Sequence, residues 1–368
     1  IVLKVEGLWK TYTVDGGEIP AVRGVSFTVQ TGEFFTLLGP SGCGKSTTLR
    51  CIAGLEVPDS AEITLGEIDL FSSRQRSSVP IHKRNIGMVF QSYAIWPHMS
   101  VYDNVDFPVK VKCVPDRREK VMRALELVGL NHLEDRSATD LSGGQQQRVA
   151  VARAIVMDVD LLLFDEPLSN LDSKLRLQMR FELRQLQKQL GITSIYVTHD
   201  QEEAMVLSDR VAVMDDGNIV EIGKPQDIYL EPRKLFTAKF IGQSNLLPGE
   251  VVSADCATAT VKTAIGEIVT GAHDSTAPSD GFLMIRPEHI PMSWVKEELL
   301  SSEVNVFEGT IVSETFTGKL MDYRIRVGEV TFEVQTPLRH ALQNENRVFI
   351  HLPPERCVML PKDTPGTS

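Results

Sequence analysis

Short apolar runs recur through the first part of the chain, and each one ends at a glycine or a polar residue. Residues 34–38, 161–164 and 194–198 form such runs, and their continuous apolarity predicts strands buried on both faces of a parallel sheet. Residues 3–29 instead alternate apolar with polar positions and are interrupted by Asp15-Gly16-Gly17. This pattern predicts two strands joined by a turn.

Further strand signals lie on either side of a region with helical character. A hairpin is expected at 63–70, a strand at 86–90 and a second hairpin at 211–223, where Asp-Asp-Gly-Asn supplies the turn. The residues from 92 to 140 change to a helical pattern, most regular in Glu119–Val128, where apolar residues recur at helical spacing. A helical insert within a sheet domain is the prediction.

From about residue 245 the chain becomes rich in short strand-like segments and turns. With 368 residues, the chain is long for one domain, so this change marks a second one. Short strands at this spacing indicate a small β-barrel. The expected strands are 249–252, 258–261, 309–315, 322–327, 330–334 and 348–352.

A glycine-rich stretch directly follows the apolar run at 34–38 and precedes a helical pattern that closes at Gly54. It matches G-x-x-x-x-G-K-[ST], in which small residues let backbone N–H groups approach phosphate oxygens at a helix N-terminus. In that geometry Lys45 reaches the β- and γ-phosphates, and the Ser46 hydroxyl is a ligand for Mg²⁺. A glycine-rich turn with a chance Lys-Ser is the alternative interpretation. The residues of the stretch are Gly39, Pro40, Ser41, Gly42, Cys43, Gly44, Lys45, Ser46 and Thr47.

Polar residues stand directly after three of the other predicted strands. Gln91 follows 86–90, Asp165 and Glu166 follow 161–164, and His199 follows 194–198. Ligands of open α/β sheets bind at the carboxyl ends of the strands. Asp165 and Gln91 therefore suit Mg²⁺, Glu166 suits a general base for the attacking water, and His199 can hold the γ-phosphate and that water. Solvated acids and a structural histidine are the ordinary alternatives.

A second candidate anion site precedes a helix that runs through Arg153. Ser142, Gly143, Gly144 and Gln145 place Ser-Gly-Gly before the helix, although an ordinary helix cap has the same pattern. Two phosphate cradles in one chain are hard to fill with one nucleotide. Tyr12 is a candidate for stacking on adenine, the alternative being that it packs against a sheet edge.

Composition narrows the classes of function. The chain is 42% hydrophobic and 24% charged with a net charge of −11 and no long basic run, which gives nucleic-acid binding no electrostatic support. No apolar stretch approaches the roughly 20 residues of a membrane span, and the first residues do not resemble a signal peptide. A cytoplasmic protein with isolated thiols is expected. Cys43, at a helix N-terminus, is expected to have a lowered pKa and to be sensitive to alkylation.

Taken together, these motifs resemble the nucleotide-binding subunit of an ATP-binding cassette (ABC) transporter. The resemblance covers about residues 3–240 and rests on the phosphate loop, Gln91, Leu141–Gln145, Leu161–Glu166, Ser169–Asp172 and His199 in the family's order and spacing. It implies an α/β P-loop NTPase with a RecA-like core, an antiparallel β subdomain and a helical subdomain at about 92–155. Residues 1–240 would form this ATPase domain and 241–368 the β-barrel domain.

The resemblance also implies partners. It implies a head-to-tail homodimer in which Ser142–Gln145 of one copy clamps the γ-phosphate of an ATP·Mg²⁺ held by Lys45 of the other. Asp172 would communicate across the dimer and Tyr12 would contact adenine. Gln91 and the following residues 92–97 would lie beside a groove for an integral membrane permease, so the chain would sit at the inner face of the cell membrane.

The second domain narrows the resemblance. With Arg286-Pro287-Glu288, it is similar to the oligonucleotide-fold-like regulatory (TOBE-like) domain of importer ATPases, which work with an external solute-binding protein. The entry sequence 240–247 is more similar to polyamine, ferric-iron and phosphonate importers than to sugar importers, which remain an alternative. A soluble cassette ATPase without a membrane partner is a more distant one. The β domain is also a candidate docking site for a regulatory protein.

Overall fold

The computed structural model describes residues 2–14, 16–255, 257–271, 279–299, 304–337 and 346–362. The chain divides into two units, Ile1–Pro225 and Gln226–Thr367. The domain boundary predicted at 240 stays a prediction. The two short helices before it, α7 (Pro225–Leu230) and α8 (Leu235–Phe240), belong largely to the second unit.

A six-stranded sheet forms the centre of the first unit, in the order β11-β10-β3-β9-β8-β7. All neighbours in it are parallel except the hairpin β10–β11. Every residue of β3, β8 and β9 is buried, which confirms the prediction from their continuous apolar sequence. The bounds are β3 Phe34–Leu38, β7 Ile86–Val89, β8 Leu161–Asp165, β9 Thr193–Thr198, β10 Arg210–Asp215 and β11 Asn218–Gly223.

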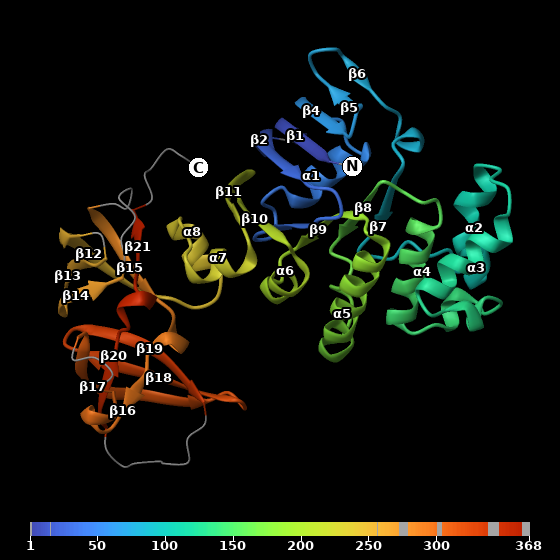
Figure 1. The fold of residues 1–368 in the computed structure, drawn as a ribbon. Coiled ribbons are helices and arrows are strands. Elements are labelled where there is room, and N and C mark those ends of the chain that lie inside the picture. The colour runs from blue at the N-terminus through green and yellow to red at the C-terminus, as the bar shows by residue number, and fades with distance from the viewer. Residues whose placement is uncertain are drawn as a thin grey trace. The chain divides into compact units, whose positions relative to one another are not determined.

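An antiparallel sheet, β2-β1-β4-β5-β6, lies on the other side of helix α1 (Lys45–Ala53), as Figure 1 shows. Leu49 and Ile52 of α1 join one hydrophobic cluster with residues of both sheets. The phosphate-loop helix is thereby fixed between two layers. The strands are β1 Leu3–Val14, β2 Gly17–Val29, β4 Ser60–Leu65, β5 Ile68–Ser72 and β6 Ser77–Ser78, and Asp15 of the predicted turn lies outside the described residues.

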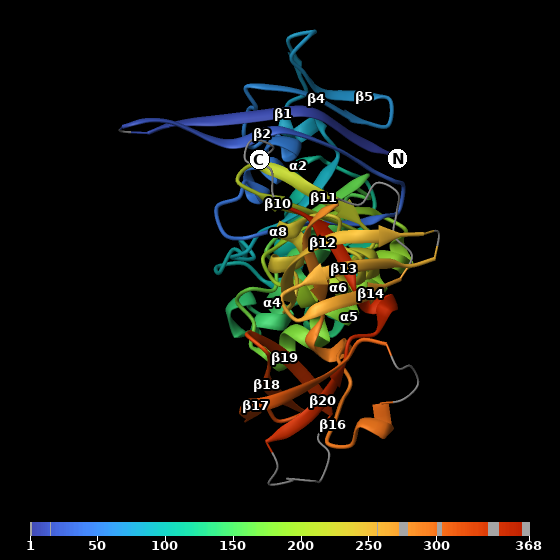
Figure 2. The same ribbon diagram turned by 90° about the vertical axis from the view of Figure 1, so that its left-hand side faces the viewer.

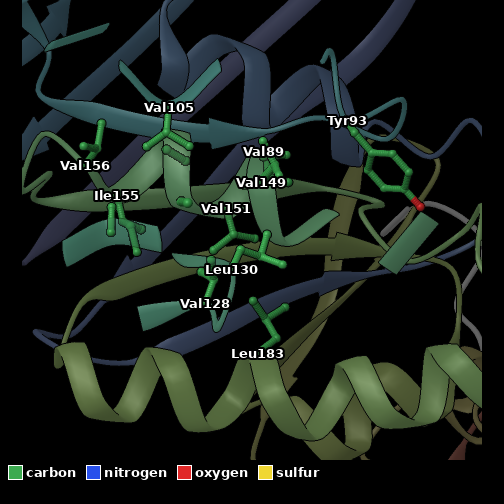
Figure 3. Packing of buried hydrophobic residues seen from close by; sticks show 14 of the residues in the cluster. Val89, Tyr93, Val105, Val128, Leu130, Val149, Val151, Ile155, Val156 and Leu183 are labelled. Atoms are coloured by element: carbon green, nitrogen blue, oxygen red, sulfur yellow. The ribbon is translucent and has the colours of Figure 1, made fainter. Parts of the chain in front are cut away.

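The helical insert consists of α2 (Val101–Val111), α3 (Arg117–Leu127) and α4 (Gly143–Ile155), and α5 (Ser173–Leu190) and α6 (Gln201–Leu207) follow later in the chain. Figure 3 shows valines of α4 and Leu183 of α5 within one hydrophobic cluster, with Leu183 directed toward Leu130. This packing ties the insert to the core.

The expectation of helical character from residue 92 onward is wrong for residues 92–100. Tyr93 and Ala94 have positive φ angles of 60° and 48°, which no α-helix accepts. Their carbonyls accept hydrogen bonds from the Arg153 guanidinium at 2.8 and 2.7 Å. Helix α2 begins only after Ser100, whose hydroxyl caps it. The turn is therefore held by a distant arginine, which no local pattern reveals.

The second unit is built on two five-stranded sheets, β14-β13-β12-β15-β21 and β16-β20-β17-β18-β19, seen as separate layers in Figures 1 and 2. All their pairings are antiparallel. One cluster joins apolar residues of both sheets, which agrees with the predicted all-β domain. The bounds are β12 Asn245–Ala254, β13 Ala259–Thr263, β14 Gly266–Thr270, β15 Asp280–Ile285, β16 Met292–Ser293, β17 Val306–Phe316, β18 Leu320–Val327, β19 Val330–Pro337, β20 Arg347–His351 and β21 Val358–Pro361.

Arg286, from the Arg-Pro-Glu motif, is 1% exposed and ties α7 and α8 to these sheets. Its guanidinium donates to the carbonyls of Tyr229 at 2.8 Å and Gln243 at 3.0 Å, and also to that of Ile241. Its charge lies over the Tyr229 ring. A buried charge is tolerated because its donors are satisfied. The motif is thus structural within this unit.

None of the helices in the part of the chain that the structure describes is long and apolar enough to cross a bilayer.

Candidate functional site

The candidate site lies where the carboxyl ends of β3, β7, β8 and β9 meet. Val89 of β7 pairs with Phe164 of β8, Asp165 with Val197 of β9, and Leu38 of β3 with Thr198. Because these strands are parallel and in register, the residues that follow them emerge at one edge. The phosphate loop, Glu166 and His199 follow their strands directly, and Gln91 is the second residue after β7.

The phosphate loop follows β3 and leads into α1 through Gly44. A Cβ on Gly44 would lie 2.2 Å from the Ala21 carbonyl oxygen, and one on Gly39 would lie 2.3 Å from that of Met214. Gly44 also has a φ of 95°, so glycine is required at this position. Since Gly44 has no side chain to cap α1, the first N–H groups of the helix are available to an anion.

The Lys45 ammonium group is folded into this loop. It is 4% exposed and donates hydrogen bonds to the carbonyls of Gly39 at 2.9 Å and Pro40 at 2.8 Å. A positive charge is therefore held within the loop itself, beside the helix N-terminus. Both features attract the same kind of ligand, a polyphosphate.

Ser46 and Asp165 form the second part of the site. The Ser46 hydroxyl, on α1, donates a hydrogen bond to Oδ1 of Asp165, the last residue of β8, at 2.6 Å. Arg50 Nη2 lies 3.5 Å from the other carboxylate oxygen. Asp165 is only 5% exposed, so it is a buried, paired carboxylate rather than a solvated one.

Glu166 and His199 form the third part. His199 Nδ1 lies 3.1 Å from Glu166 Oε2. Glu166 has a φ of 46°, in the left-handed region, and its backbone N–H donates to the Val197 carbonyl at 3.1 Å. Such a backbone costs about 1–3 kcal/mol and persists where surrounding contacts impose it. With this backbone conformation, the Glu166 carboxylate lies within contact distance of the histidine.

Gln91 lies at the same edge with an exposed side chain. Its backbone carbonyl accepts a hydrogen bond from Asn170 Nδ2 at 2.9 Å. Sequence reasoning missed Asn170 as a site residue, although it lies in the stretch that follows Glu166. It also missed Arg50, which only the fold brings near Asp165.

Residues 142–145 cap α4 and contact their own helix. The backbone N–H of Ser142 donates to Gln145 Oε1 at 3.0 Å, and that of Gln145 donates to the Ser142 hydroxyl at 3.4 Å, which is a capping box. Asp172 likewise caps α5 through Leu175 N at 3.0 Å. In the described part of the chain, no hydrogen bond or ion pair joins 142–145 to the phosphate loop.

Two further predicted residues lie at the margins of the site. Tyr12, on β1, pairs with Ile19 of β2 and is half-buried, with Lys10 Nζ 5.3 Å from its ring centroid. Cys43 lies inside the loop but is 4% exposed, and burial raises the pKa of its thiol although Lys45 opposes this. The expected lowering of the Cys43 pKa is therefore wrong, because desolvation outweighs the nearby positive charge.

Comparison with known families places these features in context. The chain matches the ABC transporter family over residues 22–169 and the TOBE domain over residues 283–360. It is 40% identical over 344 residues to the spermidine/putrescine import ATP-binding protein PotA of Clostridium novyi, covering 92% of each chain. It is 40% identical over 338 residues to the Fe(3+) ions import ATP-binding protein FbpC 1 of Rhizobium meliloti, and the match covers 91% of this chain and 92% of the relative.

A third relative matches more closely over a shorter length. The trehalose/maltose import ATP-binding protein MalK of Thermococcus litoralis is 51% identical over 242 residues, covering 65% of this chain and 64% of the relative. Among solved structures, the dimer of a bacterial ABC transporter cassette is 31% identical with a TM-score of 0.53, covering 61% of this chain and 98% of the cassette. The same cassette bound to ADP and Pi gives a TM-score of 0.52.

The fold and the site define a P-loop ATPase, with a phosphate loop, a buried carboxylate and a Glu–His pair at one sheet edge. The comparisons narrow this class. The chain belongs to the ABC transporter family, as an ATP-binding and ATP-hydrolysing subunit with a TOBE domain after the cassette.

Proposed function

We propose that this ATPase energises solute uptake through a membrane permease. The observation that carries the chemistry is the convergence of Lys45, the Ser46–Asp165 pair and the Glu166–His199 pair at one sheet edge. Import as the direction of transport is supported by two relatives that are named import ATP-binding proteins. Each of them matches this chain over about nine tenths of its length.

Mg²⁺ fits the residues present. The Ser46 hydroxyl and the Asp165 carboxylate are oxygen ligands that lie 2.6 Å apart, and Gln91 adds an amide oxygen at the same edge. Hard oxygen donors beside a phosphate cradle are the set that Mg²⁺ takes with a nucleotide. When bound, the ion would neutralise charge on the β- and γ-phosphates.

The protein groups then perform the hydrolysis. The Lys45 ammonium holds the γ-phosphate, and His199 orients that phosphate and the attacking water. Glu166 Oε2 takes a proton from the water as it attacks. Because these groups are already held in place, most of the catalysis is positioning and electrostatics.

The capping geometry of residues 142–145 supports a second copy as partner. The N-terminus of α4 is the candidate anion site, and in the described part of the chain it has no hydrogen bond to this chain's own phosphate loop. A head-to-tail dimer uses it on the γ-phosphate held by the partner's loop, with Asp172 at the junction and Tyr12 against adenine. To change the ratio of closed to open dimers from 1:99 to 99:1, ATP must stabilise the closed form relative to the open form by about 5.5 kcal/mol.

The solute class follows from similarity over the full chain. The relatives that match over about nine tenths of their length are named for spermidine/putrescine and Fe(3+). We therefore propose a polyamine, ferric iron or a phosphonate, with sugar as the alternative because the trehalose/maltose relative is 51% identical over a shorter length of 242 residues. The chain would work at the inner face of the membrane, with an external binding protein delivering the solute.

Uptake measurements test the proposal. Cells deleted for this chain's gene would be supplied with the wild-type chain or with the Lys45→Ala variant, and given labelled putrescine, ferric iron, a phosphonate or maltose. The wild-type chain should restore accumulation of one of them and Lys45→Ala should not. Equal uptake with both variants for every solute contradicts an ATP-driven import role.

A further inference from the structure

Arg176, on the first turns of α5, connects two segments that flank the candidate site. Its Nη2 donates to the carbonyl oxygens of Leu171 at 3.0 Å and Ser169 at 3.4 Å. Its Nη1 lies 3.5 Å from Asp200 Oδ2, on the residue that follows His199. One guanidinium thus contacts both the Ser169–Asp172 segment and the carboxylate beside the catalytic histidine.

The backbone around His199 is positioned by the contacts of its neighbours Thr198 and Asp200. The Asp200 N–H donates to the Thr198 hydroxyl at 2.9 Å, and Asp200 Oδ1 accepts from Glu203 N at 3.1 Å, capping α6. Asp200 Oδ2 also accepts from Arg180 Nη2 at 2.8 Å. The His199 side chain is itself 53% exposed. Its orientation therefore depends on where Asp200 and Thr198 hold its backbone.

The Thr198 side of this loop is anchored independently of Arg176. The Thr198 hydroxyl and the Tyr196 hydroxyl both donate to Glu203 Oε2, at 2.7 and 2.8 Å, in a buried cluster. On the Asp200 side, Arg180 Nη1 donates a hydrogen bond to Glu202 Oε2 at 2.9 Å. Of these two arginines, Arg176 is the one whose guanidinium donates to the carbonyls of Ser169 and Leu171.

We propose that Arg176 is a positioning residue, which couples the placement of the Ser169–Asp172 segment to the orientation of His199. The inference rests on the proposed function, in which that segment adjoins the second copy and His199 holds the γ-phosphate and water. When the segment shifts on dimer closure, the fork of Arg176 moves Asp200, and His199 moves with it. Arginine suits this role because its planar fork serves two acceptors at once, whereas a lysine ammonium is a single point of charge.

Variants of the full chain test the coupling. Arg176→Gln should lower kcat at least about tenfold, the scale expected for a misplaced catalytic group, while nucleotide affinity stays unchanged. Arg176→Lys should restore little. Arg184→Gln is the matched control, because Arg184 lies on the same helix and pairs with Asp209 but contacts neither segment. It should lower thermal stability as much as Arg176→Gln does and leave kcat unchanged.

A double-mutant cycle gives the decisive readout. Asp200→Asn keeps an oxygen for capping α6 but removes the charge that faces Arg176. The double variant Arg176→Gln/Asp200→Asn should be no slower than Asp200→Asn alone, since each change breaks the same link. Effects that multiply, or a kcat of Arg176→Gln within twofold of the control, overturn the inference.

The same assay includes His199→Ala, so that two failures are distinguishable. If His199→Ala hydrolyses ATP at the wild-type rate, the proposed role of His199 is wrong, and the inference about Arg176 falls with it. If His199→Ala is inactive but the cycle is additive, the proposed function stands and only the coupling through Arg176 is refuted.

Discussion

Replacing Glu166 with glutamine isolates the proton-accepting step. Glutamine has the same length as glutamate, so its amide can still contact His199 Nδ1, which lies 3.1 Å from the carboxylate. The phosphate loop and the Ser46–Asp165 hydrogen bond should be untouched, because within the described residues no side-chain hydrogen bond or ion pair joins Glu166 to either of them. The one property lost is the ability to take a proton from water.

The expected size of the effect follows from that loss. A general base contributes about 10²–10⁴ in rate. At 1.36 kcal/mol for each tenfold, this corresponds to about 3–5 kcal/mol of transition-state stabilisation. Glu166→Gln should therefore bind ATP as tightly as the wild-type chain and turn over at least 10² times more slowly. Glu166→Asp should also be slow, since a retraction of about 1 Å costs roughly 10².

Steady-state phosphate release and titration with a fluorescent ATP analogue measure the two quantities separately. Glu67→Gln, in the exposed β4–β5 turn, is the control for loss of one negative charge, and should match the wild-type chain in both. Wild-type turnover by Glu166→Gln would show that Glu166 is not the base. Loss of ATP binding would show instead that the carboxylate holds the site together.

Two further predictions concern the loop and the second unit. Burial raises the pKa of Cys43, so its alkylation by a maleimide at pH 7 should be slower than that of exposed Cys113 and should accelerate as the pH rises. Mass spectrometry of each cysteine-containing peptide measures the two rates. Equal rates for the two cysteines would contradict the burial of Cys43. Arg286→Met leaves buried carbonyls, among them that of Tyr229, without a hydrogen-bond donor. The free energy of unfolding, measured by thermal unfolding, should therefore fall by about 3 kcal/mol or more. An unchanged melting temperature would contradict the anchoring role of Arg286.

The sequence predicted those elements whose pattern is local. The runs at 34–38 and 194–198 are apolar because both faces of their strands are covered. Their local sequence is therefore enough to predict that they are buried in the sheet. The residues after the strand ends, among them Glu166 and His199, could be grouped at one edge because parallel strands end together.

What the sequence did not reveal depends on contacts between distant residues. The turn at Tyr93 follows from hydrogen bonds to Arg153, some sixty positions away, and the Cys43 pKa follows from how closely the loop packs. Strands β14, β15, β16 and β21 of the second unit were missed. Strand β15 pairs with β12 and β21, and β16 pairs with β20, so these pairings join segments that lie far apart in the chain. Strand β14 pairs with the adjacent β13 in a hairpin, whose local signal sequence reasoning overlooked. Arg176 carries no motif, and only the fold brings it to Asp200.

The head-to-tail shared site is the central claim, and mixing two inactive variants tests it most directly. Lys45→Ala disables the phosphate loop. Ser142→Asp keeps the helix cap but sets a negative charge against the γ-phosphate. Each variant alone should be inactive. In a mixed dimer one site carries both defects and the other carries neither, so the mixture should regain ATP hydrolysis, in proportion to the mixed dimers formed. A mixture that forms dimers and stays as inactive as its components would contradict the shared site.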